Sequence, residues 1–279
     1  MNTENAWPAG PERPPVVAGQ FYPADARQLQ SQVRGFLNQA KGEEKLKPLL
    51  VMAPHAGYMY SGAVAGQTLG RALLPQALLL LGPNHTGLGP SLSLWNGGNW
   101  SIPGGDAVVH QDLTQALARG VRAFKPDTAA HSHEHSLEVL LPFIAQVAPK
   151  ARFAAVTVAE HDLKRLMGAA KDVAAVLKGF PEPVAMVVSS DMSHYVSHEQ
   201  AKARDAMAVQ AMLDLDPARL YEVVRRHGIS MCGVLPMTLG LALARELGAT
   251  RSRLAAYATS GQASGDYRRV VGYAGVLVD

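Results

Sequence analysis

The sequence predicts a single α/β domain with a largely parallel central sheet and helices on both of its faces. Short, continuous apolar runs, which are typical of strands buried on both faces, alternate with segments whose apolar residues recur at helical spacing. Apolar residues make up 48% of the chain, enough for a sizeable core. Because no repeat or low-complexity linker divides the chain, we expect one domain over residues 16–279. The Pro- and Gly-rich residues 1–15 are expected to form a mobile tail.

The first hundred residues are expected to supply two helices, two buried strands and a hairpin. Apolar residues at helical spacing predict a helix over 28–40, and a run of small residues predicts another over 61–74. The runs PLLVMAP (48–54) and ALLLLGP (77–83) both end in proline and predict strands buried on both faces. The alternating stretch 91–100 carries Asn-Gly-Gly and predicts a hairpin.

The rest of the chain continues the alternation of helices and strands. Residues 136–148 are helical in pattern, and Pro142 must either kink this helix or lie near its start. Further strands are expected at 152–159, 182–191, 252–260 and 269–278, and further helices at 161–179, 199–213, 217–227 and 233–247.

Composition and charge exclude several classes of protein. The net charge is only +3 and no Lys/Arg block occurs, so a nucleic-acid partner is not expected. One cysteine, Cys232, argues against a disulfide-built secreted domain. The N-terminus lacks the basic and apolar regions of a signal peptide, and the apolar run around residues 77–81 is too short to span a bilayer. We therefore expect a soluble, cytoplasmic protein with no membrane partner.

Polar motifs follow three of the predicted strands at the point where each strand ends. His55 follows the first strand, Asn84 and His85 follow the second, and Asp191 and His194 follow the strand over 182–191. In open α/β sheets, ligands bind in the crevice beyond the carboxyl ends of the strands. Parallel strands would bring all three motifs to one edge of the sheet. Convergence of two imidazoles with an anionic third ligand would suit a divalent transition metal.

The residues alone leave the third ligand open among Asp191, Glu138 and Cys232. A helix is expected to start just behind Cys232, and helix N-termini lower thiol pKa values. Taken by itself, Cys232 is better explained as a small buried apolar residue. Near His55, Tyr58 is placed either to offer its hydroxyl to a ligand or simply to pack.

The stretch HSHEHSLEVLLPF is a second concentration of metal-binding side chains. His135 and Glu138 are three residues apart and would share a face if the helix has begun. A His-rich tract can bind metal, whereas the alternative is a solvated loop with an acidic helix cap. We expect Glu134, His135 and Glu138 to line or support the site, and His131 and His133 to lie at the surface.

Seven ordered motifs together resemble one protein family. They are VAGQFYPAD, APHAGYMYSG, LGPNHTG, EHSLEVLLPF, VVSSDMSHY, MCGVLPM and VGYAGVLV. They resemble the Memo family, whose bacterial and archaeal members are often called AmmeMemoRadiSam system protein B, and the match runs from about Val17 to the C-terminus. Memo proteins look like LigB-type, class III extradiol dioxygenases, which use non-haem iron(II). The resemblance implies His55, His85 and Cys232 as metal ligands, His194 as acid/base and Asp191 beside it.

The resemblance implies iron(II) as the metal, but the cysteine departs from the dioxygenase pattern. Those enzymes close the iron site with a carboxylate, whereas a thiolate is softer and shifts the preference toward copper(I), zinc or a different iron chemistry. The expected function is a redox or dioxygenase-like metal site with a small-molecule or peptide ligand. The alternatives are a non-catalytic metal- or partner-binding protein, acting with AMMECR-type and radical SAM proteins, and a ligand pocket without metal.

Overall fold

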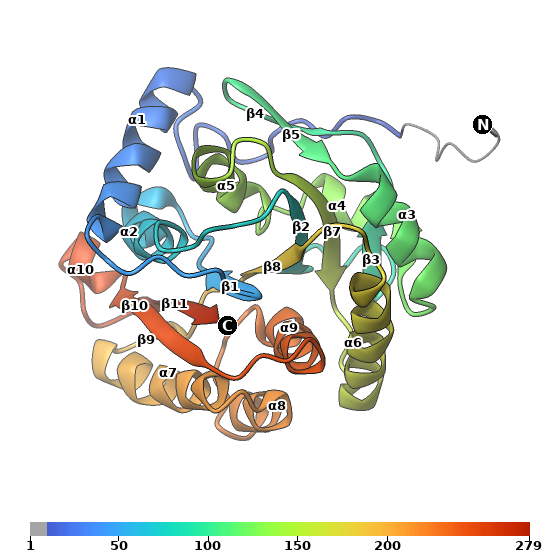
Figure 1. Cartoon of the computed structure of the whole chain (residues 1–279). Helices are drawn as coiled ribbons and strands as arrows, with labels where there is room; N and C mark the ends of the chain where they lie inside the picture. The colour runs from blue at the N-terminus through green and yellow to red at the C-terminus, as the bar shows by residue number, and fades with distance from the viewer. Residues whose placement is uncertain (1–9) are drawn as a thin grey trace.

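An eleven-stranded sheet lies between two layers of helices in the computed structural model, which describes residues 10–279 (Figure 1). The main path of the sheet runs β10-β11-β1-β8-β2-β7-β3-β6. The strands are β1 (Leu50–Ala53), β2 (Ala77–Pro83), β3 (Leu92–Trp95), β4 (Trp100–Ile102), β5 (Gly105–Val109), β6 (Lys125–Asp127), β7 (Arg152–Val158), β8 (Val184–Ser189), β9 (His194–Val196), β10 (Ser252–Thr259) and β11 (Val270–Val278).

The centre of the sheet is parallel, as the sequence predicts. β1 pairs with β8, β8 with β2, and β2 with β7, all in parallel register. β11 runs antiparallel to both β1 and β10, and β3 runs antiparallel to β7. The carboxyl ends of β1, β8 and β2 therefore lie side by side at one edge.

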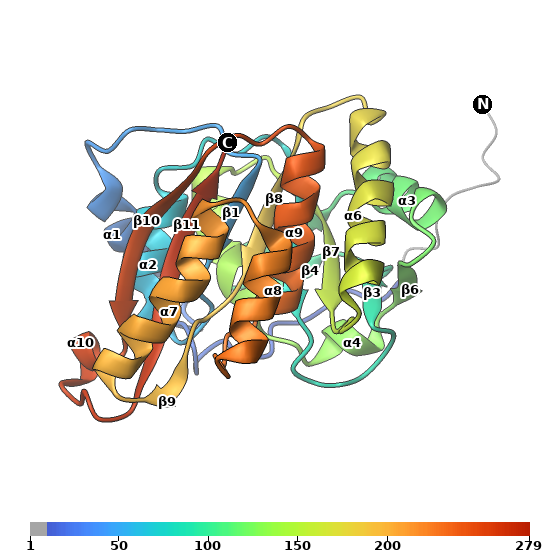
Figure 2. The same cartoon turned by 90° about the horizontal axis from the view of Figure 1, so that it is seen from below.

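Helices cover both faces of the sheet (Figure 1, Figure 2). They are α1 (Ala26–Leu37), α2 (Tyr58–Leu69), α3 (Gln111–Gly120), α4 (Ala129–Ser132), α5 (Leu141–Val147), α6 (Leu163–Lys178), α7 (His198–Leu213), α8 (Pro217–Arg226), α9 (Val234–Glu246) and α10 (Gly261–Ser264), with short 3₁₀ turns η1 (Asn38–Ala40) and η2 (Glu138–Leu140). Polar caps set several starts: Asp25, Asp162 and Asp216 accept backbone N–H groups at the first turns of α1, α6 and α8.

Two apolar cores result from the alternation of side chains along the buried strands. In β1, Leu50 and Met52 join the core that α3 and α6–α9 cover, whereas Val51 and Ala53 join the core under α1, α2 and α5. β2 alternates in the same way. Both faces of these strands are buried, which explains why their sequences read as continuous apolar runs. The single α/β domain expected from the sequence is confirmed.

The hairpin expected over residues 91–100 is wrong. β3 pairs instead with β6 and β7, and the hairpin forms between β4 and β5, one strand later. Gly104 provides the tight turn there, with a φ of +93° that favours glycine. The Asn-Gly-Gly stretch therefore serves as the connection from β3 to β4.

Two helices compare differently with the sequence-based expectations. α3 was not predicted from the sequence, whereas Pro142 lies at the start of α5, as one of the two alternatives expected.

Most of the tail expected over residues 1–15 lies outside the described residues, which begin at Gly10. Arg13, however, is only 2% exposed and packs over the ring of Trp100. Arg13 is therefore buried among residues far along the chain, and the mobile tail expected over residues 1–15 stays a prediction. Within residues 10–279, no helix has both the length and the apolar character needed to cross a membrane.

Candidate metal centre

Parallel strand ends bring the predicted motifs together. His55 and His85 each follow a strand by two residues, β1 and β2, and Asp191 follows β8 in the same way. The ring centroids of His55 and His85 are 5.4 Å apart, and Asp191 Oδ1 accepts the backbone N–H of His55 at 2.8 Å. The convergence that strand direction predicts is therefore confirmed for these three residues.

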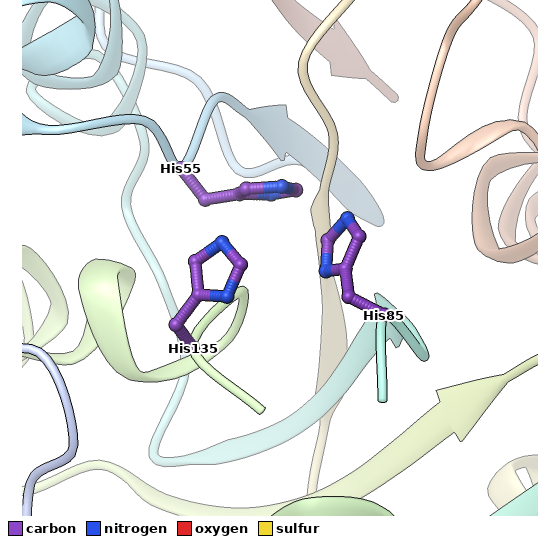
Figure 3. Close-up of side chains that lie close together, drawn as sticks. All are labelled: His55, His85 and His135. Carbon is purple, nitrogen blue, oxygen red and sulfur yellow. The ribbon is translucent and has the colours of Figure 1, made fainter. Parts of the chain in front are cut away.

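His135 is the third member of the cluster. It lies between α4 and η2, and its ring centroid is 5.5 Å from that of His55 and 4.9 Å from that of His85. One ring nitrogen from each histidine lies within 4.8 Å of the others (Figure 3). The three rings turn toward a common space, and three imidazoles form a donor set that suits zinc, copper or iron. The residues present therefore fit a divalent transition metal.

Acceptors behind two of the rings fix which nitrogen faces the cluster. Nδ1 of His85 is 2.9 Å from Glu134 Oε1, so its proton goes to a carboxylate. Nδ1 of His55 is 2.6 Å from Ser189 Oγ, and the Ser189 hydroxyl donates its own proton to the carbonyl of Ser136 at 2.6 Å. Ser189 Oγ therefore accepts from His55. In their neutral forms, both rings keep their Nε2 lone pairs for a ligand, the usual arrangement behind metal-binding histidines.

Burial favours the neutral form of two of the three imidazoles. Burial, followed by the nearby His135 and His85, lowers the pKa of His55 well below its usual value, and burial also lowers the pKa of His135. Burial acts in the same direction on His85, but the hydrogen bond and charge of Glu134 outweigh it and raise the pKa of His85. Burial raises the pKa of Glu134, but the hydrogen bonds that Glu134 accepts from His85 outweigh this effect and lower the pKa of Glu134 to about 2. A metal ligand must be deprotonated, and His55 and His135 meet that condition at neutral pH.

Cys232 lies beside the cluster, just before α9. Its Sγ is 3.4 Å from Nε2 of His55 and accepts the backbone N–H of Asp191 at 3.2 Å. Among the described residues, the donor atoms that all lie within 4.8 Å of one another come from the three histidines and not from Cys232. The thiol pKa expected to be lowered by the following helix is instead raised, because burial outweighs the helix terminus and Asp191 adds a like charge.

His194 begins β9 and is half-buried. Its Nδ1–H donates to the carbonyl of Ser230 at 2.8 Å, and its backbone N–H donates to Ser230 Oγ at 2.7 Å. Nε2 is therefore the ring nitrogen left free. His194 is close enough for a positive charge on it to lower the pKa of both His55 and Asp191, although burial dominates and raises the pKa of Asp191.

Asn84 and Tyr58, expected to line the pocket, make other contacts. Asn84 Oδ1 accepts the N–H groups of Thr86 and Gly87, and its amide donates to the carbonyl of Leu88, so the side chain shapes its own loop. Tyr58 is 1% exposed, and its hydroxyl donates to the carbonyl of Val139 at 2.8 Å. Of the two alternatives for Tyr58, packing is the one that the structure supports.

Glu138 points its carboxylate at the N-terminal segment. Oε1 accepts the Tyr22 hydroxyl at 2.7 Å and the N–H of Val17 at 3.0 Å, while Oε2 accepts from Arg13 at 2.7 Å and from the N–H of Val16 at 2.9 Å. With both oxygens used, Glu138 has no lone pair left for a metal. The condition for a shared helix face is not met, because the chain turns between His135 and η2 and the two residues do not share a helix.

The two remaining histidines of the tract behave differently from each other. His133 is exposed, as expected. His131 is fully buried, and its Nε2 lies 3.0 Å from the carbonyl of Ser93, so a surface position for it is wrong. α4 turns His131 inward against Trp95 and Trp100. Alternation along the sequence could not show this, because a short helix interrupts it.

Residues that sequence reasoning missed complete the surroundings. Ser189 and Ser136 form the relay behind His55, and the Phe21 ring packs edge-on against His135 with 5.0 Å between centroids. Ser189 belongs to the strand-end motif SSD, so its position beside His55 could have been predicted from the sequence. Phe21 had no such signal, because it is separated from His135 by more than a hundred residues of sequence.

Glu134→Gln is expected to weaken metal binding by about 10–100-fold, the usual effect of removing an acceptor behind a metal-binding histidine. The amide keeps the size of the side chain but loses the charge that holds the proton on Nδ1 of His85. Titration of the metal-free protein with Zn²⁺ measures the effect. Glu160→Gln is the matched control: Glu160 is also buried, but its hydrogen bonds go to Ser91 and Asp162. Equal affinities for the two variants would contradict this role of Glu134.

Comparison with known proteins gives a consistent result. The family model described as Memo-like protein matches residues 13–277. A MEMO1 family protein of Methanopyrus kandleri is 37% identical over 278 residues, covering 95% of this chain and 98% of the relative. One from Aquifex aeolicus is 39% identical over 268 residues, with the same two coverages. A solved structure of an uncharacterized protein from Escherichia coli K12 has a TM-score of 0.52 at 10% identity, covering 82% of this chain and 98% of that one, a likeness of fold alone.

Proposed function

This chain belongs to the Memo family, and from that premise we propose that it is a metal-binding protein with a redox, dioxygenase-like centre. One observation carries the proposal: three imidazoles converge at the carboxyl edge of a parallel sheet, and two of them have Nδ1 held by an acceptor. The metal proposed is iron(II), with copper or zinc as the alternatives that a soft ligand would favour.

His55 and His85 are the proposed core ligands, with Cys232 as the third. Support for Cys232 comes from its 3.4 Å approach to His55 and from the Asp191 N–H that points at its sulfur. The raised thiol pKa does not count against ligation, since a bound cation deprotonates a coordinating thiol outright. His135 is the competing third ligand, because its ring nitrogen already lies within the cluster.

The chain's own residues would handle binding and proton transfer. A bound redox metal would supply electron transfer and Lewis acidity at this edge. His194, anchored through Nδ1, presents Nε2 as the group that takes or gives a proton. Asp191 holds the His55 loop through a backbone N–H and lies within electrostatic reach of His194.

Metal analysis and oxygen uptake test this function. Protein purified without a chelating tag, or loaded anaerobically with iron(II), is expected to retain stoichiometric metal and to consume oxygen with a member of a catechol panel. His194→Ala should keep the metal and abolish turnover, because the acid/base group is lost while the ligands remain. If neither native nor iron-, copper- or zinc-loaded protein retains metal, the proposal fails. Loss of metal from the His194 variant would instead make His194 a ligand.

A second candidate is a metal-dependent binding protein without turnover. The observation that favours it is the accessibility of the cluster: the side chains of His85 and His135 are 35% and 25% exposed, so a peptide or protein segment can reach them. In this reading, the partners would be AMMECR-type and radical SAM proteins. Stoichiometric metal with no oxygen uptake from any catechol would select this candidate over the enzyme.

A further inference from the structure

Residues 13–22, here called the N-terminal strap, begin with a buried arginine. Its side chain donates hydrogen bonds to the segment that carries Glu134 and His135. Arg13 Nε donates to the carbonyl of His131 at 2.8 Å, and its Nη2 donates to the carbonyl of Glu134. Nη1 forms an ion pair with Glu138 at 2.7 Å, and the guanidinium lies 4.1 Å from the centroid of the Trp100 ring. One planar cation therefore holds the loop on both sides of its turn.

Glu138 fastens the strap to the same loop. Its carboxylate accepts from Arg13, from two backbone N–H groups of the strap and from the Tyr22 hydroxyl. At its far end, the strap reaches the other side of the cluster. The carbonyl of Phe21 accepts the N–H of Tyr58 at 2.8 Å, three residues after His55, and the Phe21 ring packs edge-on against His135. The strap thus contacts the segments that carry two of the three clustered histidines.

The loop needs such an anchor because regular secondary structure does not place His135. α4 ends at Ser132 and η2 begins at Glu138, so residues 133–137 belong to neither. Compared with apolar side chains of the same volume, a buried ion pair contributes little net stability. A guanidinium fork, by contrast, fixes geometry, since its donors lie in one plane at set angles.

We propose that Arg13 is a positioning residue of the metal centre, which holds His135 within reach of a metal bound by His55 and His85. This inference rests on the proposed metal binding and takes His135, the competing third ligand, as the residue that completes the ligand set. It extends the site beyond the strand-end motifs to an N-terminal segment that lies more than a hundred residues before His135 in sequence. Arg13 acts through the carbonyls of His131 and Glu134 and does not touch the metal itself.

Cobalt binding to the purified, metal-free protein tests the inference, because Co²⁺ reports both affinity and ligand set through its visible spectrum. Arg13→Lys keeps a charge for Glu138 but cannot reach both loop carbonyls. We expect it to lower Co²⁺ affinity by about 10–100-fold and to weaken the ligand-field bands as water replaces His135. Tyr22→Phe is the matched control: it removes another donor to Glu138 but leaves the Arg13 contacts in place, so affinity should not change.

A double-mutant cycle separates positioning from a general structural effect. In the background of His135→Ala, Arg13→Lys should lower Co²⁺ affinity no further, because the ligand that it positions is already gone. An equal loss in both backgrounds, or no loss in either, would overturn the inference. Should Arg13→Lys fail to fold, Arg13→Met/Glu138→Leu removes the fork without leaving an unpaired buried charge, and the same affinities are expected.

The same measurements distinguish failure of the proposed metal binding from failure of the positioning role of Arg13. Wild-type protein that binds no Co²⁺ would overturn the metal-binding function and the positioning role with it. Wild-type protein that binds Co²⁺ tightly, with an Arg13→Lys variant that binds it equally well, would overturn the positioning role alone.

Discussion

Replacing His55 with alanine is expected to abolish metal binding. His55 is buried, its Nδ1–H is held by Ser189, and its Nε2 faces both the cluster and Cys232. Loss of a ligand should cost more than the roughly 10–100-fold that loss of a supporting acceptor costs. Calorimetric titration of metal-free protein with Zn²⁺ or Co²⁺ gives the affinity. His133→Ala is the matched control, because His133 belongs to the neighbouring tract but is exposed, and its affinity should equal that of the wild type. Retained tight binding by His55→Ala would remove His55 from the ligand set.

The same titrations identify the third ligand. A thiolate bound to Co²⁺ gives an intense near-ultraviolet charge-transfer band, which an imidazole does not give. If Cys232 is the third ligand, the wild type shows this band and Cys232→Ala loses both the band and affinity, while His135→Ala keeps the band. If His135 is the third ligand, no such band appears, and His135→Ala loses more affinity than Cys232→Ala.

The second large effect is expected at Glu138 and concerns stability. Glu138→Gln should lower the free energy of unfolding by about 3–5 kcal/mol, because it leaves the Arg13 guanidinium buried without its counter-charge. Both side chains are essentially unexposed, at 1% and 0%, so solvent cannot compensate. Urea denaturation of the metal-free protein measures the loss.

Glu44→Gln is the control for Glu138. Glu44 also lies near an arginine, 3.6 Å from Arg253, but the two side chains are 69% and 28% exposed. Its replacement should therefore cost no more than about 1 kcal/mol. A similarly small loss for Glu138→Gln, combined with loss of metal affinity, would return Glu138 to the metal site and contradict its assignment to the strap.

The sequence predicted the fold correctly where the burial of a strand or helix determines the pattern of apolar residues within that same element. Strands β1, β2 and β8 are buried on both faces and read as apolar runs, and their parallel direction was enough to predict that His55, His85 and Asp191 meet. The hairpin at 91–100 failed because pairing partners are chosen in three dimensions. β3 is bonded on both sides by β6 and β7, which leaves no edge for β4.

The site divides in the same way. By itself, the sequence determined which histidines reach the sheet edge, because strand direction and motif position depend only on local pattern. The sequence also predicted that His135 lines or supports the site, but the tertiary structure alone decided that its ring completes the cluster, that Glu138 contacts the strap and that His131 is buried. These outcomes depend on contacts between segments far apart in the chain, above all those of Arg13 with the loop over residues 131–138. From the sequence, a charged residue such as Arg13 in a Pro-rich terminus is expected to be exposed to solvent. Only the folded chain brings together the residues that bury it.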